Sequence, residues 1–317
     1  MEKQLFFGMY NINQEKIENS GLLWEEIENI YKDYLSFIAE LEPTANYLVE
    51  RIRKLDKVHS TKMRIKNPEH LIEKIIRKKI KNPELKINVN NYKDLITDLI
   101  GIRALHLFKE DWRIIHEHIK QTWNLKEGPK ANVRAGDDTK LFEEADCEIV
   151  IHEFGYRCVH YLVESKPSKE IIVAEIQVRT VFEEGWSEVD HKFRYPYDVN
   201  NTIFTGYLRV FNRLAGSADE MASFIVLLKN EIDNIQQKHE TEIKEKLETI
   251  ARLESEIDSL KIDQNQKDKL YKQISTLRPA LQSTGLLSRD NRLLSDISET
   301  TEGIMGLLSS FEENRLP

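Results

Sequence analysis

The stretch Val173–Tyr195 constrains the fold of this chain more than any other part of the sequence. It begins as a strand, in which successive side chains point to opposite faces. One face is small and branched, as burial requires, and consists of Ala174, Ile176 and Val178. The other face carries a carboxylate, an amide and a guanidinium, from Glu175, Gln177 and Arg179. Such a polar row on an apolar strand indicates either a functional site or an ordinary solvated strand edge.

A helix is predicted to follow this strand directly. Thr180 is a residue type that caps helix N-termini. Trp186, Glu188 and His191 come next, with His191 about one turn beyond Glu188. The sequence therefore predicts a strand–helix unit that presents polar side chains from both of its elements.

Other segments supply the rest of the predicted fold. The periodicity predicts helices over 22–41, where Pro43 ends the run, and over 45–55, 68–80, 91–100 and 111–123. It predicts strands over 102–108, 147–151, 156–163 and 173–179. The polar segment 126–145 reads as a long loop. Because two of the strands form a hairpin-like pair, we expect a mixed sheet flanked by helices, an α+β domain.

Positive charge is concentrated between Arg51 and Lys86, which we call the basic segment. It contains thirteen Lys and Arg against four Asp and Glu, a balance of +9, so the remainder of a chain of net charge −8 carries −17. A positive segment in an acidic protein is typical of a surface that faces an anion. A solvated helix face is the alternative.

Three cations of the basic segment gather near a predicted helix start. Arg64 and Lys66 precede Pro68, a favoured first residue of a helix, and Lys74 lies further along it. Backbone N–H groups at a helix N-terminus also favour phosphate. We therefore expect phosphate binding here.

Asp98 precedes Gly101, which breaks a predicted helix, and Arg103 follows on a strand. A carboxylate at the mouth of a strand is a common magnesium arrangement, whereas a surface acid at a helix end is the plainer interpretation. The helix dipole disfavours an acid at a helix C-terminus, which favours another purpose for Asp98.

Gly155 allows a tight turn before a strand whose one face holds Tyr156, Cys158 and His160. An aromatic ring and an imidazole on one strand face fit either a binding site or simple core packing.

The remaining histidines and the cysteines indicate no further site. His116 and His118 are two residues apart on a helix, so they cannot share a metal and are predicted to lie at the surface. Cys147 and Cys158 form no zinc pattern and suit small core residues in a reducing cytoplasm. The N-terminus shows no secretion signal, and no apolar run reaches about 18 residues. We expect a cytoplasmic protein without membrane contact.

Five motifs occur in a fixed order between residues 51 and 221. They are R-x-K at Arg64–Lys66 with Lys74 behind it, D-x-x-G-x-R at Asp98–Arg103, G-Y-x-x-x-H at Gly155–His160, E-x-Q-x-R-T at Glu175–Thr180 and W-x-E-x-x-H at Trp186–His191. Together they resemble the synthetase domain of the RelA/SpoT family of alarmone synthetases. The resemblance implies a nucleotidyltransferase-like mixed sheet. It also implies a Mg²⁺-dependent enzyme that moves the β,γ-pyrophosphate of ATP onto the 3′-hydroxyl of GDP or GTP, with AMP as by-product.

The resemblance implies roles for five residues on the ATP side. Arg64 and Arg103 would sandwich the adenine, and Lys66 and Lys74 would hold the phosphates. Asp98 would bind Mg²⁺.

It implies roles for five more residues on the acceptor side. Tyr156 would stack on the acceptor base, and His160 would contact phosphates. Glu175 would bind Mg²⁺ or take the proton from the attacking hydroxyl, with Gln177 and Arg179 supporting the site.

Three departures from the family pattern lie on the acceptor side. His70 stands where Ser is usual, Cys158 replaces another Ser, and CEIVIHEF replaces the usual approach to Gly155. Toxin-type family members resemble this chain there and pyrophosphorylate the 3′ end of tRNA, whose phosphates the basic segment would suit. The acceptor stays open between a free nucleotide and tRNA. A degenerate synthetase fold used as a regulatory binding module is a further alternative. No His-Asp metal pair precedes Arg51, so we expect no hydrolase activity.

From Ile225 onward apolar residues recur at steps of three and four, with a stutter near His239. We expect a long helix in a coiled-coil-like hairpin, followed by helices over 266–277 and 291–311. This extension either mediates homo-oligomer or partner binding, sensing or self-inhibition, or braces the catalytic domain. The expected domains are an N-terminal helical segment 1–50, a synthetase domain 51–222 and a helical region 223–317.

Overall fold

A seven-stranded sheet organises Met1–Phe224, one of two compact units of the chain, the other being Ile225–Pro317. The computed structural model describes residues 3–10, 21–194, 202–259 and 263–273. The strand order is β1-β2-β7-β6-β4-β5, with β3 paired to β6. The strands are β1 Ser60–Ile65, β2 Ile100–His106, β3 Asn124–Leu125, β4 Lys130–Val133, β5 Glu148–Ile151, β6 Cys158–Ser165 and β7 Ile172–Thr180.

The sheet is mixed, as the sequence predicts. β2 runs parallel to β7, and β4 runs parallel to β5. The pairs β1–β2, β4–β6, β3–β6 and β6–β7 are antiparallel. Together with the flanking helices, these pairings confirm the predicted α+β class.

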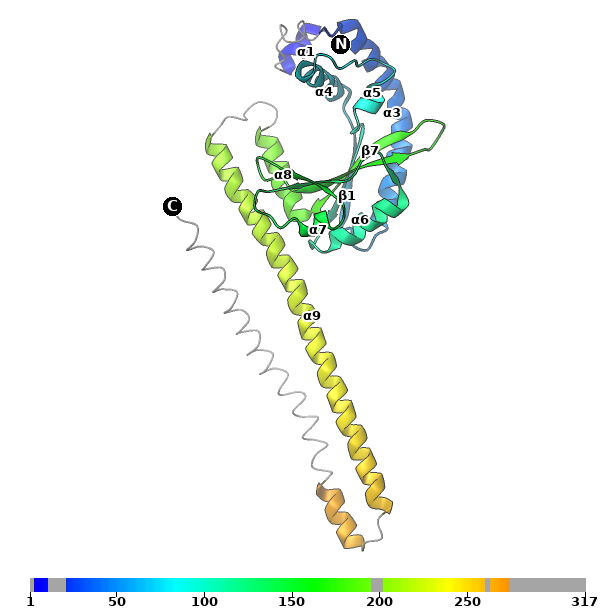
Figure 1. The fold of residues 1–317 in the computed structure, drawn as a ribbon, viewed down its shortest axis with the longest axis vertical. Coiled ribbons are helices and arrows are strands. Elements are labelled where there is room, and N and C mark those ends of the chain that lie inside the picture. The colour runs from blue at the N-terminus through cyan, green and yellow to red at the C-terminus, as the bar shows by residue number, and fades with distance from the viewer. Residues whose placement is uncertain (1–2, 11–20, 195–201, 260–262, 274–317) are drawn as a thin grey trace. The chain divides into compact units, whose positions relative to one another are not determined.

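Helices cover both faces of the sheet. In the first unit they are α1 Lys3–Met9, α3 Trp24–Arg53, α4 Pro68–Lys81, α5 Tyr92–Leu95, α6 Asp111–Thr122, α7 Lys140–Glu143 and α8 Val181–Arg194, and α9 Thr202–Ser259 begins there. Figure 1 shows α3 and α8 on opposite sides of the sheet. The apolar face of β7 joins the main core, where Ala174, Ile176 and Val178 are at most 1% exposed. The polar row of β7 therefore faces α8.

Local sequence signals explain two of the helix starts. Asn67 caps α4 by accepting hydrogen bonds from the backbone N–H groups of Glu69 and His70, and Pro68 takes the first helical position. Thr180 caps α8, because its hydroxyl oxygen accepts from the N–H of Glu183 at 3.2 Å. Both starts were predicted from the sequence.

The prediction that Pro43 ends a helix is wrong, because α3 continues through it without interruption. A proline inside a helix costs about 3 kcal/mol or more. However, α3 buries ten side chains, five on each side of Pro43. Burying one large apolar side chain contributes roughly 1.5–3 kcal/mol. Packing on the sheet therefore outweighs the missing hydrogen bond.

Three more predictions need correction. The helix expected up to Ile100 ends at Leu95, so Asp98 lies in the turn before β2 and not at a helix end. The expected loop 126–145 contains β4 and α7. His116 is fully buried instead of exposed, and its Nδ1 lies 3.0 Å from the Tyr161 hydroxyl. This partner is what allows an imidazole in the core.

The second unit is helical where it is described. The part of α9 from Ile225 onward continues to Ser259, and a further helix spans 264–273. Ile250 and Ile257 are buried against Leu270 and Tyr271, which confirms a C-terminal helical region. The predicted helix over 291–311 lies outside the described residues. None of the described helices is both long and apolar enough to cross a membrane.

Candidate active site

The sheet register gathers the predicted site residues of four strands onto one face. Residues that pair across adjacent strands share a face of the sheet. The two rows across the strands are Arg64, Gly101 and Glu175, and Arg103, Gln177 and His160. Side chains that are far apart in the sequence are therefore neighbours on the polar face beneath α8.

Asp98 forms the centre of the first group. Its Oδ2 atom lies 2.8 Å from the ammonium of Lys66 and 2.8 Å from that of Lys74. Lys66 follows β1, and Lys74 is carried by α4, so the turn before β2 meets two cations. The residue is 9% exposed, and its buried Oδ1 atom has no hydrogen-bond partner. One carboxylate oxygen is thus held by lysines while the other is available.

The titration of this cluster follows from its charges. Burial alone would raise the pKa of Asp98, but the charges of Lys66 and Lys74 lower it to about 2. Burial lowers the pKa of Lys66, and the neighbouring Lys74 and Arg64 act in the same direction, whereas Asp98 opposes them. Asp98 is accordingly ionised at neutral pH.

Gly101 gives Arg64 its place over the strand. A Cβ atom at residue 101 would lie 3.3 Å from Arg64 Nε and 3.4 Å from its Cγ, so a side chain there would push the arginine away. Arg64 and Arg103 both line a cavity of about 200 Å³, together with Gln177 and His191. The glycine of the D-x-x-G-x-R motif thus lets an arginine lie close to the sheet beside this cavity.

Arg103 is held from above by two carboxylates of α8. Its NH1 atom lies 2.8 Å from Glu184 Oε1 and also contacts Glu188. Glu184 uses its other oxygen, Oε2, for an ion pair with Arg179. One glutamate therefore bridges two arginines of the predicted site. Glu184 is not among the residues predicted from the sequence, although its position four residues before Glu188 places it on the same helix face.

Glu175 lies at the centre of the second group. Its Oε1 atom is 3.2 Å from His160 Nδ1, and its Oε2 accepts a hydrogen bond from Gln177 Nε2 at 2.7 Å. Burial would raise the pKa of Glu175, but His160 and Gln177 lower it, while Asp98 raises it. Burial would lower the pKa of His160, yet Cys158 and Glu175 raise it to about 10. His160 is therefore a cation at neutral pH.

Tyr156 adjoins this second group. Its hydroxyl lies 3.0 Å from His160 Nε2, and the guanidinium carbon of Arg179 lies 5.5 Å from the centre of its ring. The ring is also 5.3 Å from that of His152, and the side chain is half-buried. Gly155 has φ +77°, and a Cβ there would be 2.9 Å from Asn212 Oδ1, so only glycine fits this turn.

The structure thus connects the predicted residues in two groups. One contains Asp98, Lys66 and Lys74, with Arg64 and Arg103 beside the small cavity. The other contains the partners Glu175, His160, Gln177, Tyr156 and Arg179. Trp186 of the last motif lies elsewhere, because it is buried and donates to the carbonyl of Leu208 at 3.0 Å.

Comparisons with known proteins show what this chain is similar to. Residues 63–200 match the family model described as the region found in RelA / SpoT proteins. The GTP pyrophosphokinase YwaC of Bacillus subtilis (strain 168) is 25% identical over 183 residues, covering 56% of this chain and 76% of that protein.

Two solved structures are also similar to this chain. The small alarmone synthetase 1 of Bacillus subtilis is 20% identical with a TM-score of 0.44, covering 66% of this chain and 98% of that one. A GTP pyrophosphokinase family protein of Streptococcus pneumoniae is 20% identical with a TM-score of 0.41, covering 68% of this chain and 95% of that one. The family model spans every candidate residue from Arg64 to Arg179, so residues 63–200 of this chain are similar to the region found in RelA / SpoT proteins.

Proposed function

We propose that this chain is a Mg²⁺-dependent pyrophosphokinase that transfers the β,γ-pyrophosphate of ATP to the 3′-hydroxyl of GDP or GTP and releases AMP. The observation that carries the proposal is that a lysine-bound Asp98 and a histidine-bound Glu175 lie within electrostatic range of each other. The relative named GTP pyrophosphokinase supports the same reaction type.

On the ATP side, charge neutralisation and positioning are what phosphoryl-type transfer needs from a protein. Lys66 and Lys74 are the cations for the phosphates, and binding ATP would draw them from Asp98 Oδ2. Arg64 and Arg103 flank the small cavity, which would take the adenine between two guanidinium planes.

The carboxylates fit a magnesium ion. Asp98 offers a buried oxygen without a partner, and it is close enough to Glu175 to raise the pKa of that glutamate. Mg²⁺ is usually bound through one or two carboxylates together with substrate phosphates and waters. When bound, the ion would neutralise charge on the transferring phosphates.

On the acceptor side, Tyr156 would stack on the base, and Arg179 behind the ring would hold it. His160 stays protonated at neutral pH, so it would act as a cation toward phosphate and not as a base. The 3′-oxygen forms its bond to the β-phosphorus while the hydroxyl proton passes to Glu175. The bond from the β-phosphorus to the oxygen that links it to the α-phosphorus breaks, and AMP leaves with that oxygen.

One assay tests the proposal. The purified chain is incubated with Mg²⁺ and γ-labelled ATP, alone or with GDP, GTP or bulk tRNA, and AMP and labelled products are quantified. We expect label in a guanosine nucleotide, in equal amounts with AMP, and no transfer with excess EDTA. ATP-analogue binding without transfer to any acceptor would instead support a regulatory binding module.

The tRNA 3′ end is the second candidate acceptor, because the basic segment is largely exposed in the structure. Arg51, Arg53, Lys54, Lys57, Lys62 and Arg64 are all exposed. Label transferred to tRNA, with binding that falls steeply as salt rises, would identify this acceptor.

A further inference from the structure

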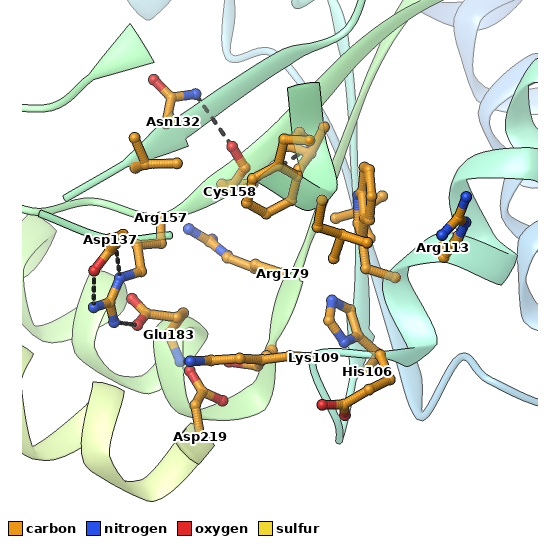
Figure 2. A pocket seen from close by; sticks show the side chains of 18 of the residues that line it. His106, Lys109, Arg113, Asn132, Asp137, Arg157, Cys158, Arg179, Glu183 and Asp219 are labelled. Carbon is orange, nitrogen blue, oxygen red and sulfur yellow. Dashed lines mark hydrogen bonds and ion pairs between the residues drawn. The ribbon is translucent and has the colours of Figure 1, made fainter. Parts of the chain in front are cut away.

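A second, larger cavity opens where β2 and β7 end and β6 begins. Its volume is about 540 Å³, within the roughly 300–1,000 Å³ typical of small-molecule sites. Figure 2 shows Arg179 reaching into it from β7. Among the ten predicted site residues only Arg179 lines this cavity, so the catalytic proposal leaves it unexplained.

One wall of the cavity is apolar. It is formed by side chains of β4, β6, β7, α6 and α7, namely Trp112, Val133, Leu141, Phe142, Val159 and Val178. The rings of Trp112 and Phe142 meet edge to face, with centroids 4.8 Å apart. Such a wall favours a ligand with a flat apolar body.

The opposite wall is charged, and its arginine is fully engaged by the protein. Arg157 binds Asp137 through two hydrogen bonds of 2.6 and 2.9 Å, and it binds Glu183 Oε1 at 2.6 Å (Figure 2). A Cβ at Gly216 would lie 2.6 Å from Arg157 NH1, so the glycine makes room for this guanidinium. Arg157 is therefore a structural cation and leaves little for an anionic ligand.

Two carboxylate oxygens of this wall lack partners. Glu183 and Asp219 are 3% and 1% exposed, and neither Glu183 Oε2 nor Asp219 Oδ1 has a hydrogen-bond partner. A buried acceptor without a donor is costly, so native proteins normally supply one. Lys109 also lowers the pKa of Asp219, but its ammonium lies 3.9 Å from Glu220 and is half exposed. Both acids line the cavity, and each has one oxygen without a donor.

The pKa values of Glu183 and Asp219 are both raised, in agreement with their missing donors. Burial raises the pKa of Glu183 to about 7, although Arg157 opposes it and Asp219 adds to it. Burial also raises the pKa of Asp219 to about 6 against the effect of Thr180, Lys109 and Arg157. The ionised forms of the two acids lack sufficient donors.

We propose that this cavity binds a small molecule with a flat apolar body and an amidine-like edge of adjacent N–H donors. The body packs against the wall of Trp112 and Phe142, and the donors satisfy Glu183 and Asp219. Such a molecule supplies an apolar surface to one wall and hydrogen-bond donors to the other. A carboxylate or phosphate ligand would place further negative charge beside two acids that each have one oxygen without a donor.

The test uses three probes that share a benzene ring and differ in the head group: benzamidine, benzamide and benzoate. Isothermal titration with the full chain should show saturable benzamidine binding, at least about tenfold tighter than benzamide, which corresponds to 1.4 kcal/mol. Benzoate should not bind. Equal affinity for all three, or no saturable binding of benzamidine, overturns the proposal.

Two variants locate the probe. Asp219→Asn removes a charge from the polar wall, and Leu141→Trp fills the half-buried apolar wall, so each should weaken benzamidine by about tenfold or more. Asp94→Asn changes an exposed acid outside the cavity and should have no effect. Circular dichroism checks that each variant is folded. Unchanged benzamidine affinity in either cavity variant overturns the assignment, and Leu141→Trp decides it alone if Asp219→Asn does not fold.

Discussion

Asp98 and Asp219 are both buried in the first unit, at 9% and 1% exposure, yet their pKa values move in opposite directions. Burial raises both pKa values in the first instance. Two lysines at 2.8 Å reverse this for Asp98, whereas no group does so for Asp219. The direction of the pKa shift in this protein is therefore decided by partners.

The two glutamates repeat the contrast. Glu175 has both oxygens engaged by His160 and Gln177, and its pKa is lowered despite burial. Glu183 has one oxygen on Arg157 and one without a partner, and burial keeps its pKa raised, at about 7. The partnered acids lie at the proposed catalytic centre, and the others lie in the second cavity. The carboxylates of the proposed catalytic centre are thus stabilised in their ionised form, whereas those of the second cavity are not.

Removing a partnered acid should have the largest effect. We expect Asp98→Asn and Glu175→Gln each to lower acceptor-dependent AMP release by about 10²–10⁴-fold, as loss of a positioned proton-transfer or metal-binding group does. Glu183→Gln is the control, because Glu183 is a buried glutamate of the second cavity, and this variant should retain activity within about tenfold. Near-normal rates in Asp98→Asn with an intact circular dichroism spectrum would remove Asp98 from the centre.

Tyr156 extends the partnered group toward the acceptor. Base stacking contributes about 1–3 kcal/mol. Tyr156→Ala should therefore raise the acceptor KM by about ten- to a hundredfold, at 1.4 kcal/mol per decade, with little change in ATP affinity. Tyr156→Phe keeps the ring and loses only the contact with His160, so its acceptor KM should stay near the native value. An equal loss of ATP affinity in Tyr156→Ala would show a core residue instead.

The buried Asp219 oxygen without a donor predicts that removing its charge stabilises the fold. The folded-state pKa of Asp219 is about 6, above its ordinary value of 3.8, so the stability it contributes below pH 4 is lost as pH rises through 6. Asp219→Asn should raise the free energy of unfolding by about 1–3 kcal/mol at pH 8 and by much less at pH 4.

The stability contributed by Asp98 depends on pH in the opposite direction. Its folded-state pKa of about 2 lies below 3.8, so its contribution to stability is present above pH 4 and is lost as pH falls toward 2.

Urea unfolding at pH 4 and pH 8 measures the difference in stability between Asp219→Asn and the native chain. A loss of stability at pH 8 would show that the ionised carboxylate is satisfied after all.

The smallest effect should come from Glu184, which joins the two halves of the site through Arg103 and Arg179. Glu184→Gln should raise both the ATP KM and the acceptor KM by about three- to tenfold, or about 1 kcal/mol, with kcat nearly unchanged. Glu188→Gln is the matched control, because Glu188 contacts Arg103. That variant should change the ATP KM alone, and identical effects of the two variants would exclude a bridging role for Glu184.

The sequence predicted the parts of the fold that local rules determine. The alternation in β7, the Thr180 cap and the Pro68 start depend on neighbouring residues, and all three are confirmed. The family resemblance is confirmed by the match over residues 63–200. The roles proposed for Asp98, Glu175 and the other site residues stay predictions.

Tertiary packing explains where the sequence was insufficient. Pro43 was expected to end a helix, but burial along α3 outweighs its local cost. His116 was placed at the surface because its partner, Tyr161, lies 45 residues away. Glu184 and the second cavity depend in the same way on elements that only the fold brings together. No periodicity in the sequence indicates such contacts.

The hydroxyl of Tyr34 donates to the carbonyl oxygen of Lys66 at 2.7 Å, and the fully buried Tyr34 ring lies edge-on to Tyr92. The family match begins at residue 63, well after α3. A recombinant fragment trimmed to the match would lose the anchor that holds Lys66 and would expose the apolar side of α4 and β1 to water. A fragment that keeps Lys66 in its place therefore needs α3, which begins at Trp24.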